Sequence, residues 1–244
     1  NVSPCQGTAG LTYSVTNVSG VSYTWTVPSG WSITGGQGTN TITVTAGTSS
    51  GDITVTPSNS CGNGTARTLA VSTITVPAQP STITGNVQPC QGTTGLTYSV
   101  TNISGVTYTW TVPSGWSITG GQGTNSITVT AGTSNGDITV TPSNTCGNGT
   151  AKTLAVTTIT VPDQPSTITG NIQPCQGATG LTYSVTNISG VTYTWAVPTG
   201  WSITGGQNTN SITVTAGTSN GDITVTPSNS CGNGTVRTLA VTTI

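Results

Sequence analysis

The sequence repeats itself with a period of 85 residues, and this periodicity restricts the chain to a fold built from one recurring domain. The stretch "VSYTWTVPSGW" at residues 21–31 returns as "VTYTWTVPSGW" at 106–116 and as "VTYTWAVPTGW" at 191–201. The first and last residues are out of phase with the repeat, which indicates a window from a longer array. We expect three domains, covering residues 1–77, 78–162 and 163–244.

Each repeat is a succession of short runs in which apolar residues alternate with Thr or Ser, the pattern of half-buried β-strands. In the second repeat, this alternation places Tyr98, Tyr108 and Trp110 on inward faces. No segment has a helical period. Seven strands at this spacing predict an all-β chain of tandem immunoglobulin-like β-sandwiches arranged as a rod. The expected strands of the second repeat are residues 81–85, 96–100, 106–112, 116–119, 126–130, 137–141 and 153–161.

Gly- and Pro-rich segments separate the strands and the domains. The turn "TGGQGTN" contains Gly38 and Gly123 in the first two repeats, and Asn208 replaces this glycine in the third. Gly and Asn are the residues that most readily adopt φ > 0, so we expect a positive φ at this position. The connectors "VPAQP" at 76–80 and "VPDQP" at 161–165 contain two prolines each, which predicts stiff links between the domains.

Charged residues make up only 3% of the chain, which has a net charge of −1 and contains no histidine. Such a chain lacks the basic field that attracts nucleic acid or an anionic membrane. No apolar run approaches the roughly 20 residues of a membrane span. The surface is expected to consist of hydroxyls and amides, with little charge repulsion between molecules. We therefore expect self-association with identical chains or between neighbouring repeats, and no nucleic-acid partner.

The six cysteines, two per repeat, favour an oxidising compartment and disulfide bonds. The two cysteines of a repeat are 56 positions apart. A bridge between them would stabilise each small domain by about 4 kcal/mol in the chain-entropy model, and this intradomain pairing is favoured. The alternatives are a bridge between repeats, such as Cys61 to Cys90 across the linker, a bridge between molecules, and free thiols. The candidate disulfide residues are Cys5, Cys61, Cys90, Cys146, Cys175 and Cys231.

Two tryptophans per repeat flank a Pro-Ser-Gly or Pro-Thr-Gly turn. The first of each pair, at Trp25, Trp110 and Trp195, shares its strand face with Val and Tyr and is expected in the core. The second follows the turn, and we expect it to cap the rim of the core. Stacking on a sugar ring or contact with a neighbouring chain is the alternative for this second set. Its members are Trp31, Trp116 and Trp201.

The sequence contains no constellation of catalytic or metal-binding residues, so we expect no enzyme activity, cofactor or metal. Asp52, Asp137 and Asp222 provide one carboxylate per repeat at a strand start, which is too few for calcium. No paired carboxylates serve glycoside hydrolysis, and no histidine can activate a nucleophile. The Cys-Gln pair of "PCQG" is a feature of internal thioesters, but the second cysteine of each repeat makes a disulfide the simpler interpretation. Isopeptide cross-links need a lysine, which two of the three repeats lack.

The succession "PCQGTTGLTYSVTNISGVTYTWTVPSGWSITGGQGTNSITVT" and then "GDITVTPSNTCGNGTAKTLAVTTITVPDQP" resembles the PKD-like, immunoglobulin-like repeats of large secreted bacterial surface proteins. Many proteins of this kind are exported by the type IX route. The resemblance covers the whole chain, three times over. Ordinary PKD domains have a W-D-F-G-D-G turn after the tryptophan. This chain has "WTVPSGW" there, without either aspartate, which argues against a metal in the turn. The resemblance implies a β-sandwich used as a stalk, spacer or adhesive repeat, and not an enzyme.

Together, these features favour a non-enzymatic, extracellular structural protein of the bacterial surface or of a secreted fibre, which forms a stalk or a self-associating filament. Rows of hydroxyls on the solvent faces, such as Ser126, Thr128 and Thr130, and weakly charged sheet edges offer a route to lateral packing. The alternative from another class is a carbohydrate-binding adhesin in which exposed tryptophans stack on a polysaccharide.

Overall fold

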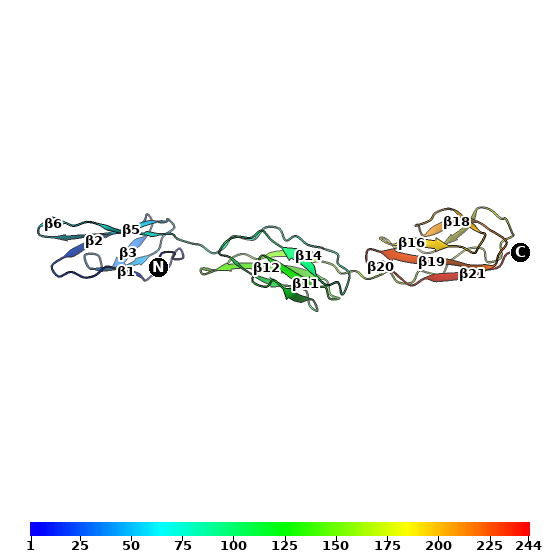
Figure 1. Cartoon of the computed structure of the whole chain (residues 1–244), viewed down its shortest axis with the longest axis horizontal. Helices are drawn as coiled ribbons and strands as arrows, with labels where there is room; N and C mark the ends of the chain where they lie inside the picture. Colours follow the sequence, from blue (N-terminus) through cyan, green and yellow to red (C-terminus); the bar gives the residue numbers. More distant parts are fainter.

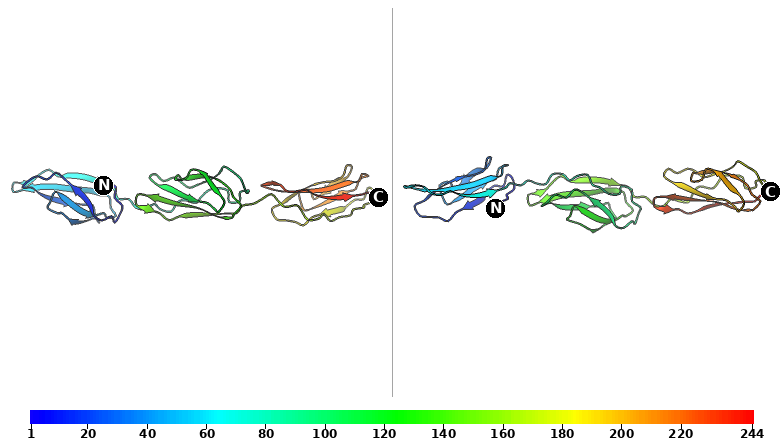
Figure 2. Two further views of the ribbon diagram at one scale, coloured as in Figure 1. Left: turned by 90° about the horizontal axis from the view of Figure 1, so that it is seen from below. Right: turned by 45° about the horizontal axis from the view of Figure 1, so that its top comes forward.

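The computed structural model describes residues 1–244, and its regular secondary structure consists entirely of β-strands. Figure 1 shows three domains in line along one axis, and the two views in Figure 2 keep the same linear arrangement. Each domain consists of two antiparallel sheets that enclose their own core. The all-β tandem sandwich expected from the sequence is confirmed.

Seven strands recur in the same order in each repeat. The first repeat contains β1 (Leu11–Ser14), β2 (Ser22–Thr26), β3 (Ser32–Gly35), β4 (Thr41–Thr45), β5 (Gly51–Asn59), β6 (Gly62–Asn63) and β7 (Arg67–Val71). The second contains β8 (Leu96–Ser99), β9 (Thr107–Thr111), β10 (Ser117–Gly120), β11 (Ser126–Thr130), β12 (Gly136–Asn144), β13 (Gly147–Asn148) and β14 (Lys152–Val156). The third contains β15 (Leu181–Ser184), β16 (Thr192–Ala196), β17 (Ser202–Gly205), β18 (Ser211–Thr215), β19 (Gly221–Asn229), β20 (Gly232–Asn233) and β21 (Arg237–Val241).

Each repeat has one sheet of three strands and one of four. In the second repeat, β11 lies between β10 and β8, whereas β12 pairs with β9 along one side and with β14 and β13 in turn along the other. The pairing changes from β14 to β13 between Val140 and Ser143, and Pro142 lies in this gap. Because proline has no N–H to donate, it is tolerated where the ladder is interrupted.

The strand boundaries of the second repeat differ from the sequence-based expectation at its first and last strands. Residues 81–85 do not form a strand; Thr84 alone pairs with Ser99, although Ile83 is buried in the core. The strand expected at 153–161 ends at Val156, because the following residues turn to hydrogen-bond with the segment around Val87 and Pro89. The seventh strand is instead the two-residue β13, which forms a hairpin with the end of β12.

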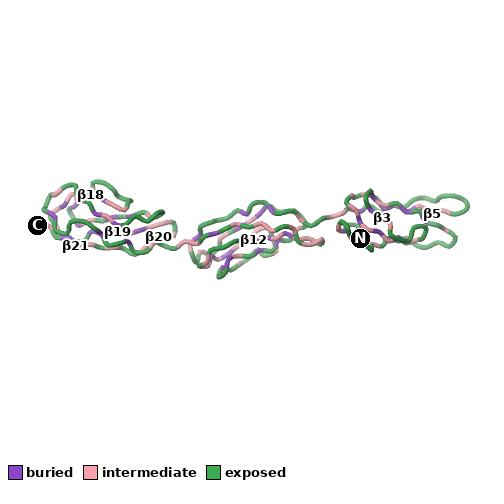
Figure 3. The backbone as a smooth tube through the Cα atoms, turned by 180° about the vertical axis from the view of Figure 1, so that it is seen from behind, coloured by how far each residue is buried: buried purple, intermediate pink, exposed green.

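The core of each domain is built from the inward residues that the alternation predicted. Tyr98, Tyr108 and Trp110 are at most 1% exposed, and the Trp110 Nε1 donates a hydrogen bond to the Thr124 carbonyl at 2.8 Å. Figure 3 shows the buried segments inside each domain, whereas the end loops are mostly exposed. Because each core is closed within its own repeat, the domains are separate packing units joined by connectors.

The "TGGQGTN" loop covers the open edge of β9. Gly123 exchanges two hydrogen bonds with Tyr108, and the φ values of 90°, 91° and 70° at Gly38, Gly123 and Asn208 confirm the expected positive φ. Next to this contact, the Gln122 amide accepts a hydrogen bond from the Trp110 N–H at 2.8 Å and donates one to its carbonyl at 2.9 Å. The glutamine side chain therefore replaces a neighbouring strand, a role that the sequence analysis did not assign.

Candidate functional site at the repeat junctions

The disulfides join neighbouring repeats and do not join the two cysteines of one repeat. Cys5 is bonded to Cys146 and Cys90 to Cys231, each pair 141 residues apart in sequence with Cα atoms 5.5 Å apart. The intradomain pairing expected from the sequence is therefore wrong, and so is the alternative Cys61–Cys90 bridge. Cys61 and Cys175, also expected in disulfides, are exposed thiols.

This pairing follows from the positions of the cysteines at opposite ends of each sandwich. Cys90 lies beside Ile159, where the chain leaves the second domain, and the N–H of the next residue donates to the Ile159 carbonyl at 2.9 Å. Cys146 lies in the turn of the β12–β13 hairpin, at the end that faces the preceding repeat. In Figure 1 the equivalent strand β20 is at the end of the third domain nearest the second. Each bridged cysteine therefore lies closer to a cysteine of the neighbouring repeat than to the other cysteine of its own repeat.

The hairpin turn "SNTCGNG" presents the cysteine through local hydrogen bonding. The Asn144 Oδ1 accepts a hydrogen bond from the Cys146 N–H at 2.8 Å, which is an Asx-turn. Gly147 follows with a φ of 124°, a conformation that residues with a Cβ rarely adopt. The Asn-x-Cys-Gly order therefore determines the tight turn that holds the sulfur at the tip of the domain.

The connector from the preceding repeat docks against this hairpin. The Asn144 Nδ2 donates to the Thr75 carbonyl at 2.7 Å, and the Cys146 Sγ lies 3.7 Å from the Ile74 carbonyl. A Cβ on Gly149 would collide with the Pro77 carbonyl, so only glycine permits this approach. The second junction repeats these contacts with Asn229 and Thr160, Cys231 and Ile159, and Gly234 and Pro162.

Further hydrogen bonds hold the far end of each connector. The Gln79 Nε2 donates to the Ala151 carbonyl at 2.7 Å, and the Gln164 Nε2 donates to the Val236 carbonyl at 2.8 Å. At the second junction, the Arg237 Nε also donates to the Pro165 carbonyl at 3.0 Å. Each junction thus combines a proline-containing connector, a disulfide and side-chain hydrogen bonds, which together restrict bending between the domains.

The tryptophans considered for ligand binding are buried in the rim of the core. Trp31, Trp116 and Trp201 are each 7% exposed. Their indole N–H groups donate to the carbonyls of Ser49, Ser134 and Ser219 at 2.8 to 2.9 Å. In the second repeat the Trp116 ring lies against Tyr98, with ring centroids 6.5 Å apart. These indoles tie the loop before β5, β12 or β19 to the core and present no open face.

The carboxylates are placed singly. Asp52, Asp137 and Asp222 are exposed second residues of β5, β12 and β19. No three His, Cys, Asp or Glu side chains are grouped so that they could hold a metal ion. The structure also contains no helix that could span a bilayer.

Three immunoglobulin-like sandwiches joined by disulfide-bridged junctions define a tandem-repeat protein. The chain belongs to the PKD-like domain family, whose pattern it matches at residues 1–71, 76–156 and 161–241. Tandem PKD-like and immunoglobulin-like repeats are typically structural domains, and the two disulfides are consistent with an extracellular location. A comparison with curated protein sequences finds no match.

Solved structures of tandem domains are similar in fold. The Escherichia coli adhesin FdeC is 17% identical, with 99% of this chain and 94% of that chain covered and a TM-score of 0.42. A domain segment of titin is 14% identical, with 100% of this chain and 96% of that chain covered and a TM-score of 0.44. Likenesses at this level carry no inference about function.

Proposed function

We propose that this chain is a non-enzymatic structural rod of an extracellular protein, in which PKD-like sandwiches form a stalk or filament on a bacterial surface. The observation that carries the proposal is the construction of the junctions. Both are closed by a disulfide between repeats and by a connector docked on the next hairpin. A flexible tether would need neither feature, whereas both features suit a rod that transmits force or holds a distance.

The cellular location in this proposal is supported by the chemistry of the junctions. Disulfides form and persist in oxidising compartments and are rare in the cytosol. The surface carries few charges, which limits repulsion between neighbouring rods. Export to a bacterial surface by the type IX route is the part of the proposal that depends on the resemblance of the repeats to secreted proteins.

Carbohydrate binding by the second tryptophan of each repeat is not part of this proposal. Stacking on a sugar ring needs an aromatic face open to solvent, and Trp31, Trp116 and Trp201 are each 7% exposed with their N–H groups already bonded. The structural role of these indoles accounts for their recurrence in every repeat.

Small-angle X-ray scattering of the oxidised protein tests the proposed function. We expect the profile of a straight rod over a range of protein concentrations. A variant in which Cys5, Cys90, Cys146 and Cys231 are replaced by serine measures how much of this rigidity comes from the disulfides. If the oxidised wild-type chain samples a wide range of bent shapes, the rod function is wrong.

A further inference from the structure

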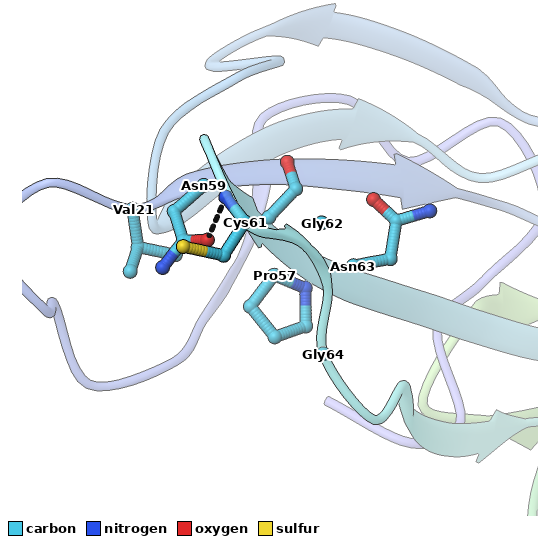
Figure 4. Close-up of a pocket in the computed structure, with 8 residues that line it drawn as sticks. Val21, Pro57, Asn59, Cys61, Gly62, Asn63 and Gly64 are labelled. Atoms are coloured by element: carbon cyan, nitrogen blue, oxygen red, sulfur yellow. Dashed lines mark hydrogen bonds between the residues drawn. The ribbon is translucent and has the colours of Figure 1, made fainter.

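The asparagine side chains of this chain fall into two groups that differ in hydrogen bonding. One group is built into the fold, as where the Asn125 Nδ2 donates to the Val100 carbonyl at 2.9 Å. The other group is exposed and makes no side-chain hydrogen bond. Figure 4 shows both kinds in one hairpin: the Asn59 Oδ1 accepts a hydrogen bond from the Cys61 N–H at 2.9 Å, whereas the Asn63 side chain has no bonded partner. Apart from Asn208, which replaces a turn glycine, the members of the second group each begin an Asn-X-Ser or Asn-X-Thr sequence, namely Asn17, Asn63, Asn102, Asn148, Asn187 and Asn233.

Asn-X-Ser/Thr is the acceptor sequence for asparagine-linked carbohydrate. We propose that Asn102 and Asn187 carry N-linked glycans in the folded protein. Both lie in the loop before the strand of the buried tryptophan, β9 or β16. The start of β9 pairs with the end of β12 through Thr107 and Ser143, so this loop lies at the end of the domain that faces the preceding repeat. The inference depends on the extracellular location in the proposed function, but not on the stiffness of the rod.

In the second repeat, the acceptor sequence forms a tight turn on the surface of the domain. The Val106 N–H donates to the Ile103 carbonyl at 3.3 Å, and Gly105 has a φ of 76°. The side chains of Asn102 and Ser104 are exposed, and neither makes a hydrogen bond. The third repeat has the same turn. A bulky group on the asparagine Nδ2 therefore displaces no contact of the fold.

The turn of the third repeat borders a cleft of about 720 Å³ between the second and third domains. The lining includes Ile188 and Ser189 of the turn and Val161 of the connector. Ile188 and Val161 are 46% and 45% exposed, although burial of such side chains is favourable. The first junction has the same exposed pair, with Ile103 at 43% and Val76 at 46%. A glycan on the asparagine before each isoleucine would cover this apolar surface and shield the connector.

The hairpin asparagines have the same acceptor sequence in a different backbone environment. Asn148 pairs with Ser143 in the ladder of β12 and β13, and the Gly149 N–H donates to the Pro142 carbonyl at 2.8 Å. A Cβ on Gly149 would also collide with the Pro77 carbonyl of the docked connector. A transferase draws the acceptor segment into its own active site, and this segment can leave the surface only if the hairpin and the junction open. We therefore expect no carbohydrate on the hairpin asparagines of the folded protein.

Glycosyl transfer joins the Nδ2 of the asparagine to the anomeric carbon of a sugar. The donor is an oligosaccharide linked to a lipid through diphosphate, and the bond between the anomeric carbon and the diphosphate oxygen breaks. The amide nitrogen loses one proton, and the lipid diphosphate leaves with the bonding electrons, so the step needs no oxidant or reductant. Such transfer takes place outside the cytosol, where disulfides also form.

Glycopeptide mass spectrometry of the protein from its native source tests the proposal, with a fragmentation method that keeps the sugar on its residue. We expect carbohydrate on Asn102 and Asn187. The substitution Ser189→Ala, expressed in the same source, removes the acceptor hydroxyl and should abolish the modification of Asn187, whereas Ser189→Thr should retain it. Ser189 is exposed and makes no side-chain hydrogen bond, so both variants should fold like the wild-type chain.

Thr235→Ala provides the matched control, because it removes the hydroxyl of the hairpin acceptor sequence in the same repeat. Thr235 is also exposed, and this variant should carry the same carbohydrate mass as the wild-type chain. Unmodified Asn102 and Asn187 would overturn the proposal. Modification of Asn148 and Asn233 to the same extent would also overturn it, because the folded environment would then not select the sites, and so would retention of the sugar in Ser189→Ala.

The cysteines of the same native sample distinguish a failure of this inference from a failure of the proposed function. Intact Cys5–Cys146 and Cys90–Cys231 bridges without carbohydrate would leave the extracellular rod in place and remove only the glycans. Reduced cysteines without carbohydrate would remove the extracellular location, on which both proposals depend.

Discussion

At the scale of single residues, Gln37, Gln122 and Gln207 are the polar groups on which the edge of each four-stranded sheet depends. Each side-chain amide makes two hydrogen bonds with the backbone of the buried tryptophan, at 2.8 to 3.0 Å. Without the amide, the N–H and C=O of a tryptophan that is at most 4% exposed would lose both partners. An unpaired buried backbone group costs about 1–3 kcal/mol.

Replacement of all three glutamines by alanine should therefore lower the free energy of unfolding of each repeat by about 1–3 kcal/mol. Urea unfolding of the oxidised protein, followed by tryptophan fluorescence, measures this change. The control is the variant Gln88→Ala with Gln173→Ala, because these side chains make no hydrogen bond in the structure. An equal midpoint for the two variants would show that the amide does not support the strand edge.

Tyrosine ionisation makes stability depend on pH at the alkaline end. Burial raises the pKa of Tyr13, Tyr98 and Tyr183 above the ordinary value of 10.0, because the phenolate would lose its hydration. At pH values between the pKa of these tyrosines in the unfolded chain and their pKa in the folded chain, the folded chain binds more protons than the unfolded chain. The stabilisation that the protonated tyrosines give to the fold is thus complete below about pH 10 and is lost as the pH rises through the folded pKa.

We expect the free energy of unfolding to fall above about pH 10, and the three Tyr→Phe substitutions together to flatten this fall. Unfolding curves at a series of pH values measure it, with Cys61 and Cys175 alkylated so that thiol chemistry does not interfere. The phenylalanine variant also loses hydrogen bonds such as that from the Tyr98 hydroxyl to the Asn86 carbonyl at 2.6 Å, so its stability should be lower at neutral pH. An unchanged slope above pH 10 in that variant would exclude these tyrosines as the cause.

At the scale of secondary structure, the β12–β13 and β19–β20 hairpins form the receiving side of the junctions. Their approach to the connector depends on glycine at Gly149 and Gly234, where a Cβ would collide with a proline carbonyl. Gly64 is the equivalent residue of the first repeat. A Cβ added to Gly64 would lie 3.1 Å from the Cγ atom of Pro57, which belongs to the same hairpin. It has no connector in front of it, so it reports the effect of the hairpin alone.

The double substitution Gly149→Ala and Gly234→Ala should displace the connectors and expose the disulfides. Overpacking of a close contact costs about 1–3 kcal/mol, which corresponds to roughly a five- to 150-fold change in an equilibrium. We expect reduction of both bridges by dithiothreitol to become faster by about this factor, as measured by thiol alkylation and mass spectrometry. Gly64→Ala should leave the rates unchanged. Similar acceleration in both variants would mean that the hairpin itself, and not the docked connector, protects the bridges.

At the scale of the whole molecule, the two disulfides shorten the covalent path from one end to the other. A path that crosses from Cys5 to Cys146, returns to Cys90 and crosses to Cys231 contains far fewer residues than the full backbone. Complete unfolding of every domain would therefore extend the oxidised chain only to the length of this shorter path.

Pulling on the two termini in an optical trap should reveal this limit. The bridged path contains residues 1–5, 90–146 and 231–244, which are 76 residues. At about 3.4 Å per residue this path extends to roughly 260 Å, whereas the reduced chain extends to roughly 830 Å. Addition of a reductant during the experiment supplies the internal comparison. Extension of the oxidised chain well beyond the shorter length would show that the bridges do not connect neighbouring repeats.

The sequence by itself determined the features that depend on neighbours along the chain. Alternation assigned Tyr108 and Trp110 to the core, and the Gly-to-Asn replacement at Asn208 located a turn with positive φ. Period 85 established the repeating domain. These inferences succeeded because strand faces and turns follow from local stereochemistry.

Only the tertiary structure decided how the repeats are joined. The positions of Cys5 and Cys61 within a repeat favoured pairing inside a domain, but they are also compatible with pairing between domains, which is what the structure shows. The choice depends on which end of the sandwich each cysteine occupies, and that follows from the path of β5, β12 and β19 and from the docking of the connector. The glutamine at the strand edge was likewise hidden, because its partner is the backbone of a tryptophan 12 residues away. Contacts of this kind follow from the packing of the sheets, and no local pattern encodes them.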